Sequence, residues 1–490
     1  MKMFEIQNTE VKKNKKEKKV KTGSLSKKQI ILITSVCISL MILLFVLLAA
    51  SVYKTIKPLS PKELTEYEAS HLEYILNQNY KERTQLVSQL PYPTFPKELF
   101  INARSAILID TATGSILFEK NADEEIPPAS MTKLVEMYVV FDAVEKGEVK
   151  LSDEVPLPKE SWAQNLPGDA SIMFLAQGQH VTLHELLLGL SIASGNDASI
   201  AVANYVCGSM EEFVGRMNDV IKSMNLTHTH FVESSGYSEK NITTAREFSA
   251  FCRAYITRFP FALEDYHSQK ELRYPKEKNL PDWIRNSDNN PGDSQAVIQY
   301  NTNKLLGQLP GCDGLKTGFI NESGYNIALT AERYGTRFLS VTMGGPGNGS
   351  REGNIYRSQD GTSLMEYAFE SFADYHAPDG ENKHVFTVGV TGSKNKSINL
   401  IPALEENLTV PFITGGSPKG AASSVTARAY VPDVIYGDVK AGEAFGTITY
   451  SIGDTVLRTI PLVADRDSPK KKGLCALWGK TVYCAVKILR

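Results

Sequence analysis

A serine one helical turn before a lysine, Ser130-Met131-Thr132-Lys133, is the feature of this sequence that most restricts its possible folds. The spacing places the hydroxyl and the amine on one face of a helix, where the amine can take the hydroxyl proton. Two further polar motifs follow far downstream, Ser194-Gly195-Asn196 and Lys316-Thr317-Gly318. We therefore expect an activated serine nucleophile, with the three motifs in one site.

Other copies of these motifs occur in the chain, so the local context has to select among them. Ser130 follows two prolines and precedes the apolar segment 134–141, a pattern that predicts a buried helix. Ser194 directly follows the apolar helical segment 186–193, whereas Ser287-Asp288-Asn289 lies in a turn-forming run. The remaining copies lie in polar tails or turns and begin at Lys21, Ser24, Ser393 and Ser468.

An uncharged, almost continuous apolar run, residues 30–53, is long enough to cross a bilayer as a helix. The lysine-dense segment 12–28 precedes it, which predicts a cytoplasmic N-terminus and export of everything after residue 53. A cleaved signal peptide is the alternative, because Ala49-Ala50-Ser51 offers small residues to a peptidase. The run exceeds the usual apolar region of about 7 to 15 residues in such peptides, which favours an uncleaved anchor.

Composition argues against several function classes. The net charge is −2 and combines a basic tail with a slightly acidic remainder, which gives no support for nucleic-acid binding. The six cysteines show no Cys-x-x-Cys pair and no zinc spacing. His180 and His184 have the helical spacing of metal ligands but lack the glutamate of a metalloprotease motif. We predict neither a metal nor another cofactor.

The order of the expected elements predicts two folded parts. Residues 107–119 form a strand, tight turn and strand; helical segments fill 132–255; strands return at 325–331 and 337–343, before a helix at 362–372. This order predicts an α/β (α+β) domain whose sheet is completed by its two chain ends, with helices on the faces. After residue 378, short β-type runs separated by Gly, Pro, Asn and Lys predict a small all-β sandwich.

The C-terminal segment carries apolar residues at helical spacing from Leu474 to Leu489, with lysines elsewhere on the helix. We expect a cationic amphipathic helix in a membrane interface; packing on the β domain and a disordered tail are the alternatives. The predicted division of the chain is a basic cytoplasmic tail 1–28, a transmembrane signal anchor 29–53, a helical spacer 54–98, a catalytic domain 99–380, a β-sandwich accessory domain 381–466 and the amphipathic helix 467–490.

From about Arg104 to Phe372 the sequence resembles the low-molecular-mass penicillin-binding proteins, the serine D-alanyl-D-alanine carboxypeptidases. The resemblance extends beyond the three motifs to Asp197-Ala198, Thr229-His230-Phe231, Thr244-Ala245-Arg246-Glu247, Asn303-Lys304-Leu305-Leu306, Asp313-Gly314-Leu315 and Gly324-Tyr325-Asn326. It implies a serine β-lactamase/DD-peptidase-like transpeptidase domain followed by the small β domain. The β-rich tail and the amphipathic end are similar to that family's accessory domain and membrane anchor.

The resemblance implies that Ser130 attacks the penultimate D-alanine of a peptidoglycan stem pentapeptide, forms an acyl-enzyme and releases the terminal D-alanine. Water then resolves the acyl-enzyme, and β-lactam antibiotics are expected covalent inhibitors. Lys133 can act as the base only if its pKa falls from about 10.4, and burial and the cation Lys316 both lower it. Ser194 is expected to pass a proton to the leaving amine, and Asn196 to hold Lys133 and the substrate amide in register.

On the substrate side, the resemblance implies that Lys316, Thr317 and Gly318 lie on an edge strand, where Thr317 meets the terminal carboxylate. The backbone N–H groups of Ser130 and Phe319 would form the oxyanion hole. Arg351 is the expected cationic partner of the carboxylate when positions are counted forward from Met343-Gly344-Gly345. Arg357 fits instead when they are counted back from Leu364.

Two alternatives remain open for the function. A class A-like β-lactamase needs a glutamate-activated water, and Glu233-Ser234-Ser235-Gly236-Tyr237 offers a glutamate, with tyrosine where a supporting asparagine would stand. A non-catalytic cell-wall-binding protein would not need the motif side chains, all of which are intact. D,D-endopeptidase and weak transpeptidase activities would use the same residues. We therefore expect an enzyme of the cytoplasmic membrane, with its catalytic domain on the extracytoplasmic side.

Overall fold

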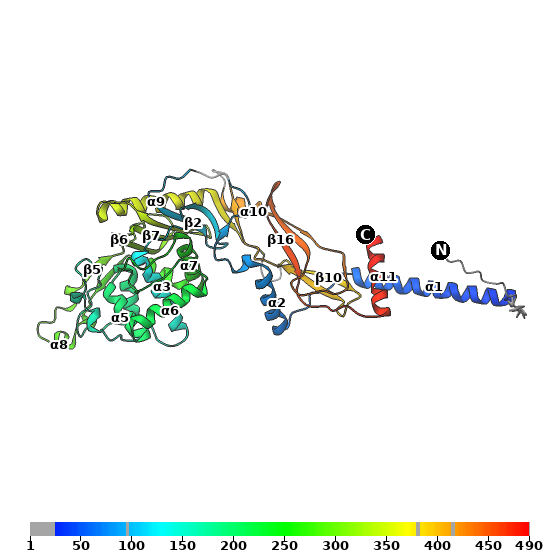
Figure 1. Cartoon of the computed structure of the whole chain (residues 1–490), viewed down its shortest axis with the longest axis horizontal. Helices are drawn as coiled ribbons and strands as arrows, with labels where there is room; N and C mark the ends of the chain where they lie inside the picture. Colours follow the sequence, from blue (N-terminus) through cyan, green and yellow to red (C-terminus); the bar gives the residue numbers. More distant parts are fainter. Residues whose placement is uncertain (1–24, 95–97, 379–382, 413–416, 490) are drawn as a thin grey trace, which may run out of the picture.

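The computed structural model describes residues 25–94, 98–378, 383–412 and 417–489. The chain is elongated, with a mixed domain at one end, a β domain in the middle and a long helix at the other end (Figure 1). Most of the predicted basic tail 1–28, the motif copies that begin at Lys21 and Ser24, and the expected boundary at 380–381 lie outside the described residues.

The mixed domain is built on one six-stranded sheet in the order β1-β3-β2-β8-β7-β6, antiparallel except for the β1–β3 pair. Strands from the N-terminal part of the domain pair with strands from its C-terminal part, as the sequence predicts. Ile107 in β2, for example, pairs with Val341 in β8. The strands are β1 (Ser88–Gln89), β2 (Ser105–Asp110), β3 (Ser115–Lys120), β6 (Cys312–Ile320), β7 (Gly324–Arg333) and β8 (Thr336–Gly345). β6 is the edge strand of this sheet, and an edge strand has backbone groups without a strand partner.

Helices cover both faces of this sheet (Figure 1). One face carries most of them: α3 (Lys133–Glu145), α4 (Leu183–Leu188), α5 (Asn196–Cys207), α6 (Met210–Ser223), α7 (Ala245–Arg258) and α8 (Asp282–Arg285), with the short turns η2 (Ala129–Thr132), η5 (Gly189–Ala193) and η6 (Leu263–His267) and the hairpin β4 (Glu271–Tyr274) and β5 (Val297–Tyr300). The other face carries α9 (Ser350–Ser371).

Helix α9 begins at Ser350, well before the expected start at residue 362. Its first half contains Gly353, a residue that costs free energy inside a helix and argues against one. A Cβ at Gly353 would lie 2.2 Å from the ring of Tyr325, so this glycine is what lets the helix approach β7. The packing that requires the glycine is a tertiary contact, and the sequence pattern carries no sign of it.

The second domain is all-β, with a six-stranded sheet in the order β13-β15-β16-β11-β10-β14. Its strands are β10 (Phe386–Thr391), β11 (Ser397–Pro402), β13 (Thr426–Tyr430), β14 (Val434–Tyr436), β15 (Ala444–Ile452) and β16 (Thr455–Ala464), with the short helix α10 (Pro418–Ser423) before β13. A second, two-stranded sheet pairs β12 (Leu408–Pro411) with β9 (Phe372–Tyr375), the direct continuation of α9. The expected strands are present; β9, β14 and α10 were not anticipated.

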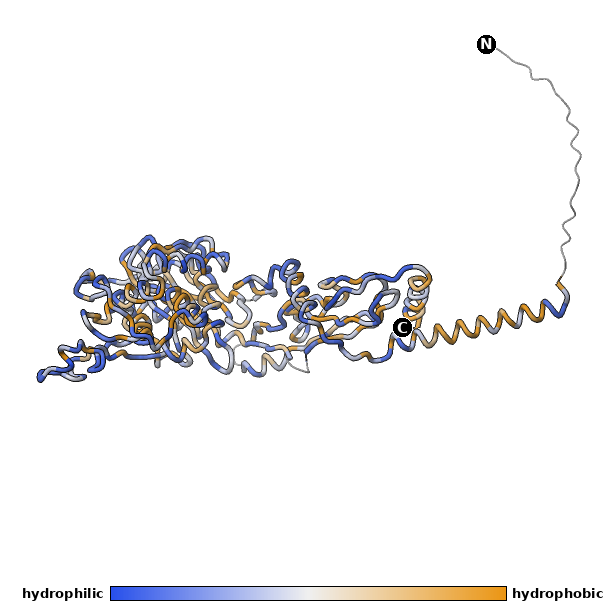
Figure 2. Tube along the Cα trace, turned by 90° about the horizontal axis from the view of Figure 1, so that it is seen from below, coloured by the Kyte–Doolittle hydropathy of each residue, from blue (hydrophilic) through white to orange (hydrophobic). Residues whose placement is uncertain are grey.

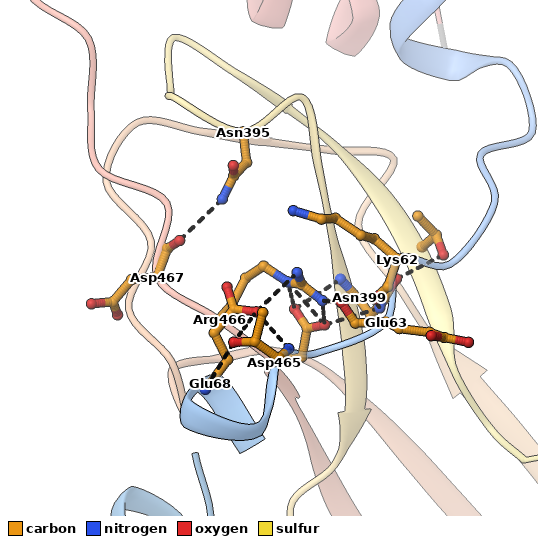
Figure 3. Close-up of polar contacts among 10 residues, drawn as sticks. Lys62, Glu63, Glu68, Asn395, Asn399, Asp465, Arg466 and Asp467 are labelled. Atoms are coloured by element: carbon orange, nitrogen blue, oxygen red, sulfur yellow. Dashed lines mark hydrogen bonds and ion pairs between the residues drawn. The ribbon is translucent and has the colours of Figure 1, made fainter. Parts of the chain in front are cut away.

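The segment expected to be a helical spacer packs on the β domain. Helix α2 (Glu66–Asn79) buries Leu72 and Leu76 against Ala403 and Val463. Arg466 adds a polar contact, since its guanidinium donates to Asp465 at 2.8 Å and to the carbonyl of Lys62 at 2.6 Å (Figure 3). The turn η1 (Lys81–Thr84) and then the two-residue strand β1 lead into the mixed domain.

The two terminal helices meet at the far end of the β domain. Helix α1 (Lys27–Ile56) is the one described helix whose length and composition would allow it to cross a membrane, a property that signal sequences share. Most of this helix has the hydrophobic colour in Figure 2. Helix α11 (Leu474–Leu489) crosses its last turns, where Val482 and Val486 are buried with Val52 and Val434. The outward side of α11 still exposes Leu474 and Leu477.

Candidate active site

The Ser-x-x-Lys motif lies where η2 runs into α3. Lys133 is fully buried, and its ammonium nitrogen Nζ is 3.4 Å from Oγ of Ser130, 2.8 Å from Oδ1 of Asn196 and 2.5 Å from the carbonyl oxygen of Ser235. Ser130 itself is partly exposed. The lysine can therefore exchange a proton with a serine hydroxyl that a ligand can reach.

The second motif joins η5 to α5. Ser194 adopts a left-handed backbone conformation, φ 60°, which breaks the helical path and turns the chain into Asn196 at the start of α5. The Ser194 hydroxyl is buried and has no hydrogen-bond partner among the described residues. Asp197 fixes the neighbouring loop, because its carboxylate accepts from the backbone N–H groups of Met173 and Leu175.

The third motif lies on the edge strand β6. Lys316 is 1% exposed, and Thr317 donates through its hydroxyl to Thr302 at 2.6 Å. Gly318 allows β6 to approach the turn that carries Ser130, residues 128–132, which we call the serine turn. A Cβ at this position would lie 2.5 Å from the Pro128 carbonyl oxygen. The structure thus brings Ser130, Lys133, Ser194, Asn196 and the Lys316-Thr317-Gly318 segment into one site.

Burial dominates the electrostatics of this site. It lowers the pKa of Lys133 to about 8, although the carboxylates of Glu136, Glu233 and Asp197 oppose the shift. Burial also holds the pKa of Lys316 well below its ordinary value, and the positive charges of Lys133 and Arg357 push it the same way. A neutral lysine beside Ser130 is therefore accessible at physiological pH, as a general base requires.

The two candidate arginines occupy different environments. Arg351 lies exposed in the first turn of α9, and no described contact joins it to the motifs. Arg357 is 7% exposed, and burial lowers its pKa to about 10. Its guanidinium carbon is 5.8 Å from the ring centroid of Tyr325, and this ring stacks at 4.3 Å on the half-exposed Phe319.

The sequence pattern did not indicate the roles that Ser235 and Gly236 have in this site. The Ser235 carbonyl accepts from Lys133, and Gly236 (φ 81°) lets its loop pass the serine turn, with a hypothetical Cβ 1.9 Å from the Ala129 carbonyl oxygen. Glu233 accepts hydrogen bonds from Ser235 and from the backbone N–H of Gly236, both at 2.7 Å or less. The glycine was the one available signal, since a left-handed turn favours this residue.

The remaining candidates of the sequence analysis lie outside this site. Nδ1 of His180 contacts Glu154 at 2.6 Å, whereas Nδ1 of His184 contacts the Tyr266 hydroxyl, so the two rings do not converge. Within the described ranges no group of three His, Cys, Asp or Glu side chains could hold a metal ion. The six cysteines, all within these ranges, are unpaired.

A buried lysine between a serine nucleophile and an edge strand defines the class of serine acyl-transfer enzymes. Residues 93–347 match the family described as D-alanyl-D-alanine carboxypeptidase, and residues 378–470 match the C-terminal domain of penicillin-binding protein 5. The chain therefore belongs to the D-alanyl-D-alanine carboxypeptidase family of serine peptidases. The predicted family, fold class and enzyme class are confirmed.

Individual relatives match over most of their length. The D-alanyl-D-alanine carboxypeptidase DacF of Bacillus subtilis (strain 168) is 30% identical, over 79% of this chain and 90% of the relative. DacC of Escherichia coli (strain K12) is 31% identical, over 74% and 83%. Among solved structures, penicillin-binding protein 5 of Haemophilus influenzae superposes with a TM-score of 0.63 at 25% identity, over 77% of this chain and all of that one.

Proposed function

We propose that this protein is a serine-type D-Ala-D-Ala carboxypeptidase that removes the terminal D-alanine from peptidoglycan stem pentapeptides and that β-lactams acylate at Ser130. The observation that carries the proposal is the contact of the buried Lys133 with both Ser130, at 3.4 Å, and Asn196, at 2.8 Å. The family supports the same activity, which its named members share.

The proposed mechanism starts with the neutral amine of Lys133. It takes the proton of Ser130 as Oγ attacks the carbonyl carbon of the penultimate D-alanine. The backbone N–H groups of Ser130 and Phe319 stabilise the oxyanion, a type of contact worth about two to three orders of magnitude in rate. The unpartnered hydroxyl of Ser194 relays a proton to the leaving amine of D-alanine, and water then hydrolyses the acyl-enzyme.

For the substrate carboxylate we propose Thr317 and Arg357 in place of Arg351. Nη2 of Arg357 lies 3.5 Å from the carbonyl oxygen of Thr302, the residue whose hydroxyl accepts from Thr317. The burial of Arg357 would strengthen an ion pair with an incoming carboxylate. The exposed Arg351 has neither property. The substrate would extend along the open edge of β6, beside Gly318.

The β-lactamase alternative is weakened by the hydrogen bonds of Glu233. Its carboxylate accepts from the backbone of Ser235 and Gly236 and from the side-chain amide of Asn241, and so it is committed to its own loop. A carboxylate that activates water needs a free lone pair toward the acyl bond. A wall-binding role without catalysis leaves the buried Lys133 unexplained.

The proposed location is the outer face of the cytoplasmic membrane. Helix α1 would cross the bilayer, and the exposed apolar side of α11 would lie in its interface. The packing of Leu48 against the cluster that Val52 forms with α11 supports an uncleaved anchor, because cleavage near Ala50 would remove Leu48. We retain the six-part division of the chain, with helix α2 of the spacer attached to the β domain.

The test is D-alanine release from a synthetic pentapeptide ending in D-Ala-D-Ala, with the full chain in detergent. We expect Ser130→Ala to abolish release, because it removes the nucleophile. Ser287→Ala is the matched control, since Ser287 belongs to a motif copy that lies exposed outside the site. Release that persists in Ser130→Ala, or that the wild-type protein lacks, would refute the assignment.

A further inference from the structure

The side chain of Phe319 has no role in the mechanism proposed above, which uses only its backbone N–H group. Its ring is 45% exposed, although Phe319 directly follows the third motif on β6. Side chains alternate between the two faces of a strand, so this ring lies on the same face of β6 as Thr317 and on the opposite face from Gly318. Gly318 faces the serine turn, and the ring of Phe319 therefore points away from that turn.

The ring of Phe319 is supported by a layer of packed side chains. It stacks on the ring of Tyr325, its cross-strand neighbour in β7, with 4.3 Å between the two centroids. The Tyr325 ring is 3% exposed and packs on Gly353 of α9, and the guanidinium carbon of Arg357 is 5.8 Å from its centroid. One face of the Phe319 ring is thus covered, and the rest of it is open to solvent.

The groups proposed for the substrate carboxylate lie on this same face of the sheet. The Thr317 hydroxyl donates to that of Thr302 at 2.6 Å, and Arg357 lies 3.5 Å from the Thr302 carbonyl oxygen. Thr317 and Phe319 are two residues apart on one strand, a separation of about 7 Å. A carboxylate that binds Thr317 and Arg357 therefore lies beside the ring of Phe319.

This carboxylate belongs to the terminal residue of the stem peptide, which is also the leaving group. The side chain of that residue is attached to the carbon that bears the carboxylate, so it too lies close to Phe319. An apolar side chain that covers the open ring removes apolar surface on both partners from water, which favours binding. A polar side chain in the same place loses hydration instead, because the ring offers it no hydrogen bond.

We propose that Phe319 determines specificity for the terminal residue: its ring forms an apolar subsite that accepts D-residues with apolar side chains larger than the methyl group of D-alanine. The bond between the penultimate carbonyl carbon and the terminal nitrogen breaks, Oγ of Ser130 takes the acyl group, and the leaving amine takes the proton that Ser130 gives up. Water then hydrolyses the acyl-enzyme, so the products are the tetrapeptide and a free D-amino acid. The inference rests on the proposed function, because it concerns the same reaction.

The test compares pentapeptides that end in D-Ala-D-Ala, D-Ala-D-Leu and D-Ala-D-Ser, with the full chain in detergent and release of the terminal residue as the readout. We expect the wild-type protein to hydrolyse the D-leucine peptide with a kcat/KM at least equal to that for the D-alanine peptide, and the D-serine peptide with a lower one. Phe319→Ser keeps the backbone N–H group and removes the ring, so the ratio of kcat/KM for D-leucine to that for D-alanine should fall by about tenfold. Phe319→Leu keeps an apolar surface and should hold this ratio within about threefold of the wild-type value.

The ratio separates specificity from a structural role, because a loss of folded enzyme lowers both kcat/KM values equally. Phe261→Ser is the matched control: Phe261 is 42% exposed and its ring packs on that of Phe141 at 5.0 Å, but no described contact joins it to the three motifs. This variant should keep the wild-type ratio. A ratio that Phe319→Ser leaves unchanged would overturn the proposal. If Phe319→Ser does not fold, the wild-type protein decides: a D-leucine peptide that is hydrolysed less well than the D-serine peptide refutes the subsite.

The same experiment distinguishes this inference from the proposed function. Release of D-alanine with equal ratios in the wild-type protein and Phe319→Ser refutes the subsite and leaves the carboxypeptidase in place. Absence of release from every peptide refutes the carboxypeptidase, and the subsite with it.

Discussion

At the scale of single residues, the site depends on two backbone segments that pass so close to the serine turn that no Cβ atom fits between them. Gly236 and Gly318 both face the chain that carries Ser130, from different elements. Because they lack a Cβ, the loop at Gly236 and strand β6 lie in direct contact with the backbone next to Ser130. A shift of about 1 Å in such a position costs on the order of a hundredfold in rate.

Gly236→Ala tests this dependence. Its Cβ would meet the Ala129 carbonyl oxygen, so the serine turn has to move, and we expect penicillin acylation to fall by at least about tenfold. Gly208→Ala is the control, because Gly208 has nearly the same φ, 80°, but nothing within 4 Å of its Cβ. Equal losses in both variants would mean that backbone strain, rather than the displaced serine, is responsible.

The arginine assignment gives a second prediction at this scale. We expect Arg357→Gln to lower kcat/KM for the pentapeptide by about 10- to 100-fold, the loss of a charge-assisted contact of about 1.5–3 kcal/mol. Arg351→Gln should leave kcat/KM within about twofold, because its side chain is solvated. Peptide kinetics measure both, and the opposite ranking would return the carboxylate to Arg351.

At the scale of elements, α2 belongs to the β domain through its buried leucines. Leu72→Ala should destabilise this domain by about 2–5 kcal/mol, because it opens a cavity against Ala403 and Val463. Tyr74, on the same helix, is 65% exposed, and Tyr74→Ala should cost little. Thermal unfolding measures the difference; equal melting temperatures of the two variants would show that α2 does not depend on this contact.

At the scale of the whole molecule, a buried carboxyl pair lies where the domains join. Asp110 ends β2 and accepts from the Thr409 hydroxyl of β12, while Asp374 lies in β9 with one oxygen unpartnered. Burial, with the charges of Asp110 and Glu332 in support, raises the pKa of Asp374 to about 10. The folded protein therefore binds a proton that the unfolded chain releases above about pH 4.

The raised pKa of Asp374 makes the stability of the folded protein depend on pH. Because the pKa is raised on folding, the pair lowers stability progressively as pH rises from about 4 toward 10. We expect Asp374→Asn to raise the melting temperature at pH 8 by about 3 °C or more and to leave it almost unchanged at pH 4. Melting curves at both pH values check the prediction, which fails if the gain is larger at pH 4.

The sequence by itself determined what depends on local pattern. The Ser-x-x-Lys spacing on a helix, the strand, turn and strand at 107–119 and the short β-type runs after residue 378 are each encoded within a few residues, and the resemblance to the family followed from such motifs. Local periodicity also set apart Ser194 from the copy at Ser287, because apolar helices and turn-forming runs differ over short stretches.

Only the tertiary structure decided which distant surfaces meet. The burial of Arg357 rather than Arg351, the start of α9 at Ser350 and the packing of α2 and α11 on the β domain each depend on partners far away in the sequence. A side chain's charge state follows from its surroundings, and these exist only in the folded chain.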